Sequence, residues 1–156
     1  MDPVIVVCGA ASEEVHRTVA DLPLHVVDNL VWKDGIGSSI HAGLTAAYDH
    51  DVDAIVVALG DQPLLGPETF ARLVTTWQTE GRPVVASEYS GTVGAPALFA
   101  RSMFGRLGAL PTDQGCKKVI LDLPGDRVAL CACPDAAVDI DTPDEYERLR
   151  VAGSAA

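Results

Sequence analysis

Positively charged residues are scarce in this sequence of 156 residues. It has 11 lysines and arginines against 22 aspartates and glutamates, which gives a formal net charge of -11 at pH 7. A broad surface for nucleic acid or for an anionic membrane needs excess positive charge, so this balance argues against both partners. It also leaves the binding of a polyphosphate dependent on a local site or on a metal ion. We therefore expect a phosphate-handling enzyme of this composition to use a divalent cation.

Long apolar runs and ordered cysteine patterns are missing as well. No stretch reaches the ~18 apolar residues that a spanning helix needs. No basic region precedes the first apolar run, "VIVVCG", so we expect no signal peptide and a cytoplasmic location. The cysteines form neither a disulfide framework nor paired C-x-x-C metal hooks, which predicts free thiols. Without a G-K-[ST] P-loop or a G-x-S-x-G elbow, a P-loop NTPase and a serine hydrolase are disfavoured.

What the sequence does contain is a regular alternation of short apolar runs and helical patterns. The runs are rich in β-branched residues and continuous, as in strands covered on both faces. They begin at Val4, Leu24, Asp53, Pro83 and Arg127, and helical patterns span residues 12–20, 38–48, 67–80, 113–123 and 143–151. This alternation predicts right-handed βαβ units and a mostly parallel sheet. We predict one α/β domain over residues 1–150, followed by a disordered tail at residues 151–156.

The stretch "ALGDQPLL" follows the third apolar run, and ligands of open parallel sheets bind outside the carboxyl ends of the strands. Gly60 allows close backbone approach and Pro63 stops the strand, so the Asp61 carboxylate is expected to emerge at that edge. A Mg²⁺ ion takes one or two protein carboxylates and fills its other positions with phosphate oxygens and water. Asp61 is therefore a candidate Mg²⁺ ligand, and the alternative is an aspartate that forms a turn.

Three further segments follow predicted strands. "DGIGSSIHAGL" can bind an anion or a nucleotide through backbone N–H groups and hydroxyls, or it is a loop with a serine N-cap at Ser38 or Ser39. In "VDIDTPDEY", Asp139 and Asp141 point to one side if the stretch is extended and can hold a metal, or Asp141 or Thr142 caps the next helix. "SGTVGAPALF" offers a glycine-rich approach to a substrate, or a hairpin turn.

Taken together and in order, these segments resemble one family. "WKDGIGSSIHAGL", "ALGDQPLL", "YSGTVGAPALFARSMFGRL", "LPTDQGCKKVI" and "VDIDTPDEYERL" are similar to the MobA-like nucleotidyltransferases, in particular the molybdenum cofactor cytidylyltransferases. The resemblance implies a Rossmann-like three-layer sandwich of the nucleotide-diphospho-sugar-transferase type. It also implies transfer of CMP or GMP from CTP or GTP to the terminal phosphate of molybdopterin, with Mg²⁺ and release of pyrophosphate.

The resemblance also implies roles for individual residues. Asp61 and Asp141 would be the catalytic metal ligands, with Asp139 as a further one. The other matched positions are Gly60, Gln62 and Pro63 in the turn of Asp61; Gly35, Gly37, Ser38 and Ser39 in the loop at the base and ribose; and Gly91, Gly94, Pro96, Asp113, Gln114 and Gly115 on the acceptor side.

One motif of the family is absent. Its members begin with a strand and a loop of the form L-A-A-G-x-S-x-R-M-G-x-x-K that holds the triphosphate, whereas "MDPVIVVCG" matches their second strand, which implies an N-terminally truncated domain. Strand edges would then be unpaired unless another segment or a second copy of the chain, as in a homodimer, covers them. The alternative to an enzyme is a non-catalytic relative that binds molybdenum cofactor or nucleotide and carries it to a molybdoenzyme or its chaperone.

Two smaller departures concern the acceptor. Ala95 stands where the family usually has histidine, and Cys116 with Lys117 stands where alanine and arginine are usual. A different phosphorylated acceptor is therefore the alternative to molybdopterin.

Overall fold

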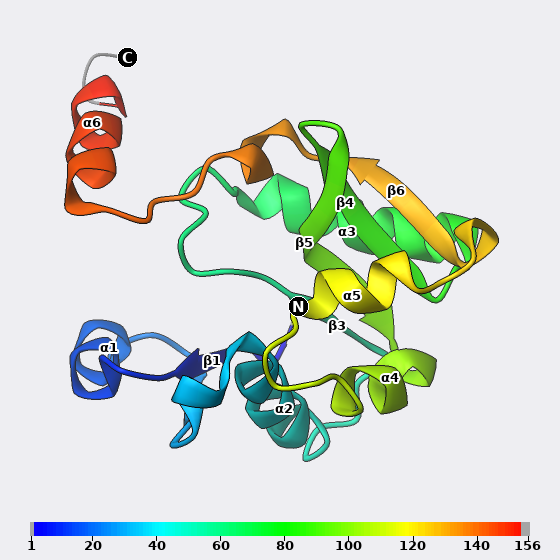
Figure 1. Cartoon of the computed structure of the whole chain (residues 1–156), viewed down its shortest axis with the longest axis horizontal. Helices are drawn as coiled ribbons and strands as arrows, with labels where there is room; N and C mark the ends of the chain where they lie inside the picture. The colour runs from blue at the N-terminus through cyan, green and yellow to red at the C-terminus, as the bar shows by residue number, and fades with distance from the viewer. Residues whose placement is uncertain (1, 154–156) are drawn as a thin grey trace.

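The computed structural model describes residues 2–153 and shows an α/β fold with two sheets (Figure 1). β1 (Ile5–Cys8) and β2 (His25–Asp28) form a parallel pair. The second sheet has the order β3 (Ala54–Val57), β5 (Thr92–Ala100), β4 (Val84–Tyr89) and β6 (Val128–Ala132). Because β5 is antiparallel to both β3 and β4 while β4 and β6 are parallel, only β5 runs against the others. The predicted mostly parallel sheet is confirmed.

β5 is absent from the strands predicted above. Its sequence, "TVGAPALFA", contains a glycine and a proline, both of which weaken a strand assignment. The register of β4 and β5 shifts between Ala86 and Ser87, so Ala95 and Pro96 fall outside the regular ladder. The side-chain hydroxyl of Ser87 donates to the carbonyl of Pro96 at 2.6 Å and restores one lost hydrogen bond. The proline is tolerated because side chains replace the ladder at this bulge.

The helices follow the sequence closely. They are α1 (Ser12–Val19), α2 (Ile36–Ala47), α3 (Pro67–Glu80), α4 (Phe104–Gly108), α5 (Cys116–Leu121) and α6 (Pro143–Gly153). α3 has the predicted bounds, with proline in the first turn and Gly81 in the left-handed conformation after the last residue. α4 is not among the predicted helices. α6 continues through residues 151–153, into the predicted tail, and residues 154–156 lie outside the described part.

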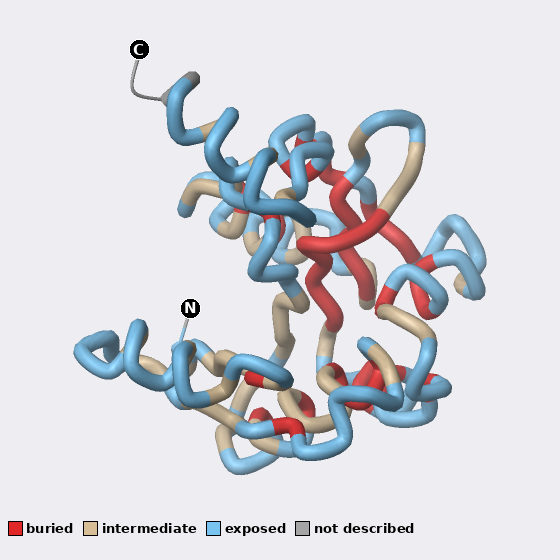
Figure 2. Tube along the Cα trace, turned by 60° about the vertical axis from the view of Figure 1, so that its left-hand side comes forward, coloured by how far each residue is buried: buried red, intermediate tan, exposed pale blue. Residues whose placement is uncertain are grey.

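Two hydrophobic clusters cover the two faces of the four-stranded sheet. On one face, α2, α4 and α5 pack on β4 and β5 through residues such as Leu44, Leu107 and Ile120. On the other face, Leu73 of α3 packs on Val85 and on neighbouring strands. Figure 2 shows the buried segments concentrated in this sheet and its helices. The three-layer arrangement predicted from the resemblance is therefore observed.

The four cysteines, Cys8, Cys116, Cys131 and Cys133, are free, as predicted, and all four are buried. Burial raises the pKa of Cys116 to about 11, so it remains a thiol at neutral pH. None of the helices in residues 2–153 is long and apolar enough to cross a membrane.

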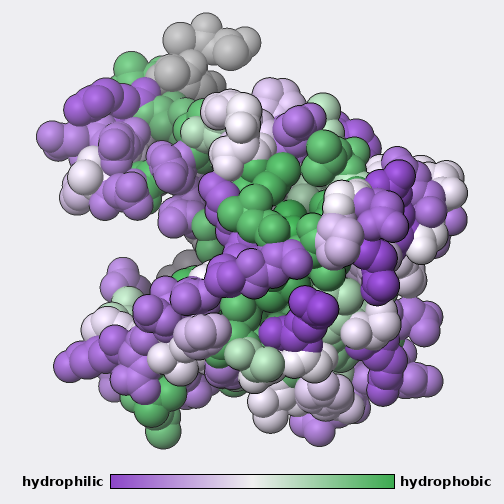
Figure 3. Space-filling model, turned by 45° about the vertical axis from the view of Figure 1, so that its right-hand side comes forward, coloured by the Kyte–Doolittle hydropathy of each residue, from purple (hydrophilic) through white to green (hydrophobic). Residues whose placement is uncertain are grey.

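β1 and β3 each lie at the edge of a sheet. Within residues 2–153, β1 pairs only with β2, and β3 pairs only with β5. α2 nevertheless spans both sheets: it packs against β1 and β2, and its Ile40 and Leu44 join the core against which Val57 of β3 packs. The unpaired strand edges expected from the sequence are thus present, and Figure 3 shows hydrophobic side chains in the middle of the indented face it displays.

Candidate functional site

The two predicted metal-binding segments lie side by side. The backbone N–H of Ile140 donates to the carbonyl of Asp61 at 2.9 Å. This hydrogen bond places Asp61 alongside Asp139 and Asp141, the chain neighbours of Ile140, and all three aspartates are exposed. Among the described residues, no three His, Cys, Asp or Glu side chains are grouped well enough to hold a metal by themselves. An ion at this place would therefore rely on one or two carboxylates and on ligand oxygens, which is the usual mode of Mg²⁺.

The structure identifies Thr142, and not Asp141, as the residue that caps the next helix. The hydroxyl of Thr142 accepts from the N–H of Glu145 at 3.3 Å, and the Glu145 carboxylate accepts from the N–H of Thr142 at 2.8 Å. This reciprocal pair is a capping box, with Thr142 as the N-cap of α6. Hydrogen bonds from the hydroxyl of Thr142 and from the N–H groups of Asp141 and Thr142 lower the pKa of Glu145. Capping uses only the backbone of Asp141, so its exposed carboxylate is available to a ligand.

Gln62 holds the turn that carries Asp61. Its side chain is 8% exposed, and its Nε2 donates to the carbonyl of Ala136 at 2.9 Å and to that of Ala95 at 3.3 Å. Ala95 lies in the bulge of β5, and Ala136 belongs to η4 (Pro134–Ala137), the turn before Asp139. One buried amide therefore joins the Asp61 turn, β5 and the segment of the second aspartate. Its role is to position backbone, since the side chain does not reach the surface.

The two other residues of this turn are exposed. A Cβ built on Gly60 meets no atom within 4 Å, so the close backbone approach predicted at this glycine is not observed. Pro63 is exposed and follows the end of β3.

The predicted nucleotide loop packs directly against the predicted acceptor-side turn. Gly35 has φ 118°, in the region that favours glycine, and its Cβ would meet the carbonyl of Thr112. A Cβ on Gly37 would overlap with the carbonyl of Pro111, and the N–H of Gly37 donates to the carbonyl of Thr112 at 2.8 Å. Both glycines therefore permit the approach of residues 111–115, which include Asp113, Gln114 and Gly115.

The serines of this loop have different surroundings. α2 begins at Ile36 after Gly35, so the predicted N-cap at Ser38 or Ser39 is wrong. The Ser38 hydroxyl is buried, donates to the carbonyl of Gly35 at 2.7 Å, and accepts from Nδ2 of Asn29 at 2.8 Å. Ser39 also accepts from Nδ2 of Asn29, at 3.1 Å, but is only partly buried. Of the two hydroxyls, that of Ser39 is the accessible one.

Sequence reasoning missed Asn29. It is 4% exposed at the end of β2, where its amide bonds both serines and its Oδ1 accepts from the N–H of Val31 at 3.0 Å. Its position in the sequence could have identified it, because a residue that directly follows a predicted buried strand lies at the ligand-binding edge of the sheet.

The segment "SGTVGAPALF" contains a hairpin turn, the alternative stated above. Ser90 and Gly91 have positive φ of 49° and 72°, as a two-residue hairpin turn between β4 and β5 requires. Gly94 lies under the hydroxyl of Tyr89, where a Cβ would overlap with it. Pro96 is fully buried, so its ring does not face a substrate.

These contacts connect the predicted residues into one band. The loop at Gly37 contacts the turn at residues 111–115, and this turn leads into α5. α5 packs on β5, and Gln62 joins β5 to the Asp61 turn.

Grooves lie on the surface of residues 2–153 near these elements. A shallow groove of 280 Å³ beside Asp139 is also lined by Arg148 of α6. A larger groove of 590 Å³, lined by Trp77 and Arg82, lies before the start of β4 and contains none of the predicted site residues.

Comparisons with known proteins agree with the family resemblance of the sequence. Residues 1–128 match the family described as the MobA-like NTP transferase domain. The chain is 31% identical to the nicotine blue oxidoreductase of Paenarthrobacter nicotinovorans, over 94% of this chain and 74% of that protein. It is 29% identical to the purine catabolism protein PucB of Bacillus subtilis, over 84% of this chain and 62% of that protein. The chain therefore spans less than two thirds of the length of PucB.

A solved structure extends the likeness to three dimensions. The structure of Rv0371c from Mycobacterium tuberculosis in complex with manganese matches with a TM-score of 0.76 and 29% identity, over 96% of this chain and 77% of that one. The Rossmann-like α/β fold predicted from the sequence is confirmed by this match.

Proposed function

This chain belongs to the MobA-like NTP transferase family, and on that premise we propose that it transfers CMP or GMP from CTP or GTP to the terminal phosphate of molybdopterin. An oxygen of the acceptor phosphate attacks the α-phosphorus of the nucleotide, a new P–O–P bond forms, and pyrophosphate leaves. The observation that carries the proposal is the hydrogen bond between Ile140 and Asp61, which brings exposed aspartates from two distant segments together.

A divalent cation suits the donors at this place. Asp61, Asp139 and Asp141 offer only carboxylate oxygens, which are the ligands that Mg²⁺ and Mn²⁺ prefer. We assign Asp61 and Asp141 as the ligands, with Asp139 as a further one. A bound Mg²⁺ would neutralise negative charge on the phosphates, which a chain with net charge -11 otherwise opposes.

The remaining site residues would bind and orient the reactants. The loop of Gly35, Gly37 and Ser39 borders the base and ribose, and Asn29 holds that loop through both serines. Gln62 keeps the Asp61 turn at a constant position relative to β5. No protein nucleophile is needed, because the acceptor phosphate itself attacks; the protein contributes positioning and charge neutralisation.

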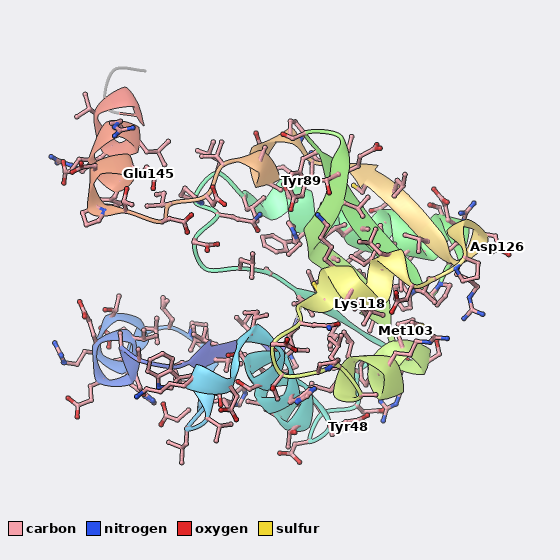
Figure 4. All side chains as sticks on the ribbon, viewed as in Figure 1. Tyr48, Tyr89, Met103, Lys118, Asp126 and Glu145 are labelled. Carbon is pink, nitrogen blue, oxygen red and sulfur yellow. The ribbon has the colours of Figure 1, made fainter. Side chains whose placement is uncertain are left out.

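The test measures pyrophosphate release by the full chain from CTP and from GTP, with molybdopterin and Mg²⁺ or Mn²⁺. Asp61→Asn is expected to lower the rate about a hundredfold or more, because it removes a charged metal ligand without changing side-chain size. Asp126→Asn is the matched control: this exposed aspartate lies in a turn before β6, far from the site in Figure 4. Absence of both turnover and nucleotide binding would refute the proposal, and binding of nucleotide and molybdopterin without turnover would favour a carrier.

A further inference from the structure

Tyr89 lies across one face of the β4–β5 hairpin. It is the direct partner of Thr92 in the register, and directly opposed residues of an antiparallel pair share a face. Gly94, two residues after Thr92, lies on the same face. The Tyr89 hydroxyl occupies the space that a side chain on Gly94 would fill. The absence of a side chain at Gly94 therefore lets the tyrosine ring fold over β5, and the hydroxyl is held at a defined place.

Lys117 reaches the same face from α5. Its Nζ donates to the hydroxyl of Thr92 at 2.7 Å. The lysine is exposed, and none of the ion pairs formed within residues 2–153 includes it. The next residue, Lys118, differs in this respect because it pairs with Asp122 on its own helix. Lys117 thus presents an uncompensated positive charge in a strongly acidic chain.

The surroundings of the Tyr89 hydroxyl are those of a ligand-binding group. The ring is half-buried, and the hydrogen bonds found in the described part of the chain leave the hydroxyl without a partner. Burial raises the pKa of Tyr89, and Cys116, Asp139 and Cys133 raise it further, so the hydroxyl keeps its proton and can donate. The N–H of Cys133 donates to the carbonyl of Glu88 at 2.9 Å and η4 packs against β4, so the end of β4 that carries Tyr89 lies beside the segment that leads to Asp139. Figure 4 labels Tyr89 near the hairpin and the segment that leads to α6.

We propose that the Tyr89 hydroxyl and the Lys117 ammonium bind the phosphomonoester group of the acceptor, and this inference rests on the proposed function. One neutral and one charged donor then converge on phosphate oxygens from two elements, β4 and α5, on one face of the hairpin. Because η4, which leads to Asp139, packs against β4, the pair would hold the attacking phosphate beside the metal-bound nucleotide. Lys117 supplies the positive charge that selects an anionic acceptor in a chain of net charge -11.

The experiment compares equilibrium binding of molybdopterin, of molybdopterin with its phosphate removed, and of CTP with Mg²⁺. Tyr89→Phe and Lys117→Met are each expected to weaken molybdopterin binding about tenfold, because each removes a hydrogen bond to a charged group. Binding of the dephosphorylated compound and of CTP is expected to stay at the wild-type level. Lys118→Met is the matched control and is expected to change none of the three affinities. Lys117→Arg is expected to restore most of the loss.

Three results would overturn the inference. Unchanged molybdopterin binding by Tyr89→Phe and Lys117→Met would show that the pair does not contact the acceptor. An equal loss for the phosphorylated and dephosphorylated compounds would show a packing role instead. Failure of the wild-type chain to bind molybdopterin while it still binds CTP or GTP would also refute the pair, whereas failure to bind both nucleotides would refute the proposed function itself.

Discussion

Replacing Gln62 with methionine should destabilise the fold and weaken metal binding together. Methionine keeps the length of the side chain but has no N–H donor. The carbonyls of Ala136 and Ala95, which accept from Nε2 at 2.9 and 3.3 Å, would then be left without that partner in a buried place. The turn that carries Asp61 would lose its connection to β5 and to η4.

The magnitude follows from those two hydrogen bonds. Loss of the shorter one in a buried site costs about 1–3 kcal/mol, and the longer one adds roughly 0.5–1 kcal/mol. The substitution also removes Oε1, which is buried and has no hydrogen-bond partner, and this gives back roughly 1 kcal/mol. The expected net loss of unfolding free energy is about 0.5–3 kcal/mol, and each kcal/mol lowers Tm by about 2–4 °C in a chain of this size.

Urea unfolding followed by circular dichroism measures the stability, and titration with Mn²⁺ measures the site. Gln78→Met is the control. Gln78 is exposed on α3, so this substitution makes the same chemical change outside the buried hydrogen bonds of Gln62. Gln62→Met is expected to unfold at lower urea and to bind Mn²⁺ more weakly than this control. Equal stability of the two variants would refute the role of Gln62 as the connection between the three segments.

Three further predictions follow from single contacts. Gly37→Ala should destabilise the chain because its Cβ overlaps with a backbone carbonyl, whereas Gly60→Ala should be tolerated in open space; thermal unfolding compares them. Asn29→Ala should weaken CTP binding in calorimetry, and unchanged affinity would contradict its role in holding the loop. The ionised Glu145 carboxylate, whose pKa is lowered, stabilises the capping box above the unfolded carboxyl pKa, so the helix signal should fall as pH drops through the lowered pKa. This fall should be smaller in Thr142→Ala, which loses the hydroxyl but keeps the backbone N–H donors.

Helices and most strands were predictable because their determinants are local. α3 has its predicted bounds since Pro67 occupies its first turn and Gly81 its left-handed end, both set by neighbours in sequence. The Thr142 cap was one of two predicted options, and its partner lies three residues away. β5 could not be found this way. Its ladder partners belong to β3 and β4, and the bulge at Pro96 depends on the Ser87 side chain of another strand.

The sequence alone determined the residue types of the candidate site, because the order and spacing of its motifs identify the family, and motifs are local. Only the tertiary structure decided which of them meet. The bond from Ile140 to Asp61 joins segments far apart in the chain, and the burial of Ser38 leaves Ser39 as the accessible hydroxyl. The position of the Tyr89 hydroxyl over Gly94 likewise follows from strand register. Such contacts depend on backbone pairing between distant segments, which no short motif encodes.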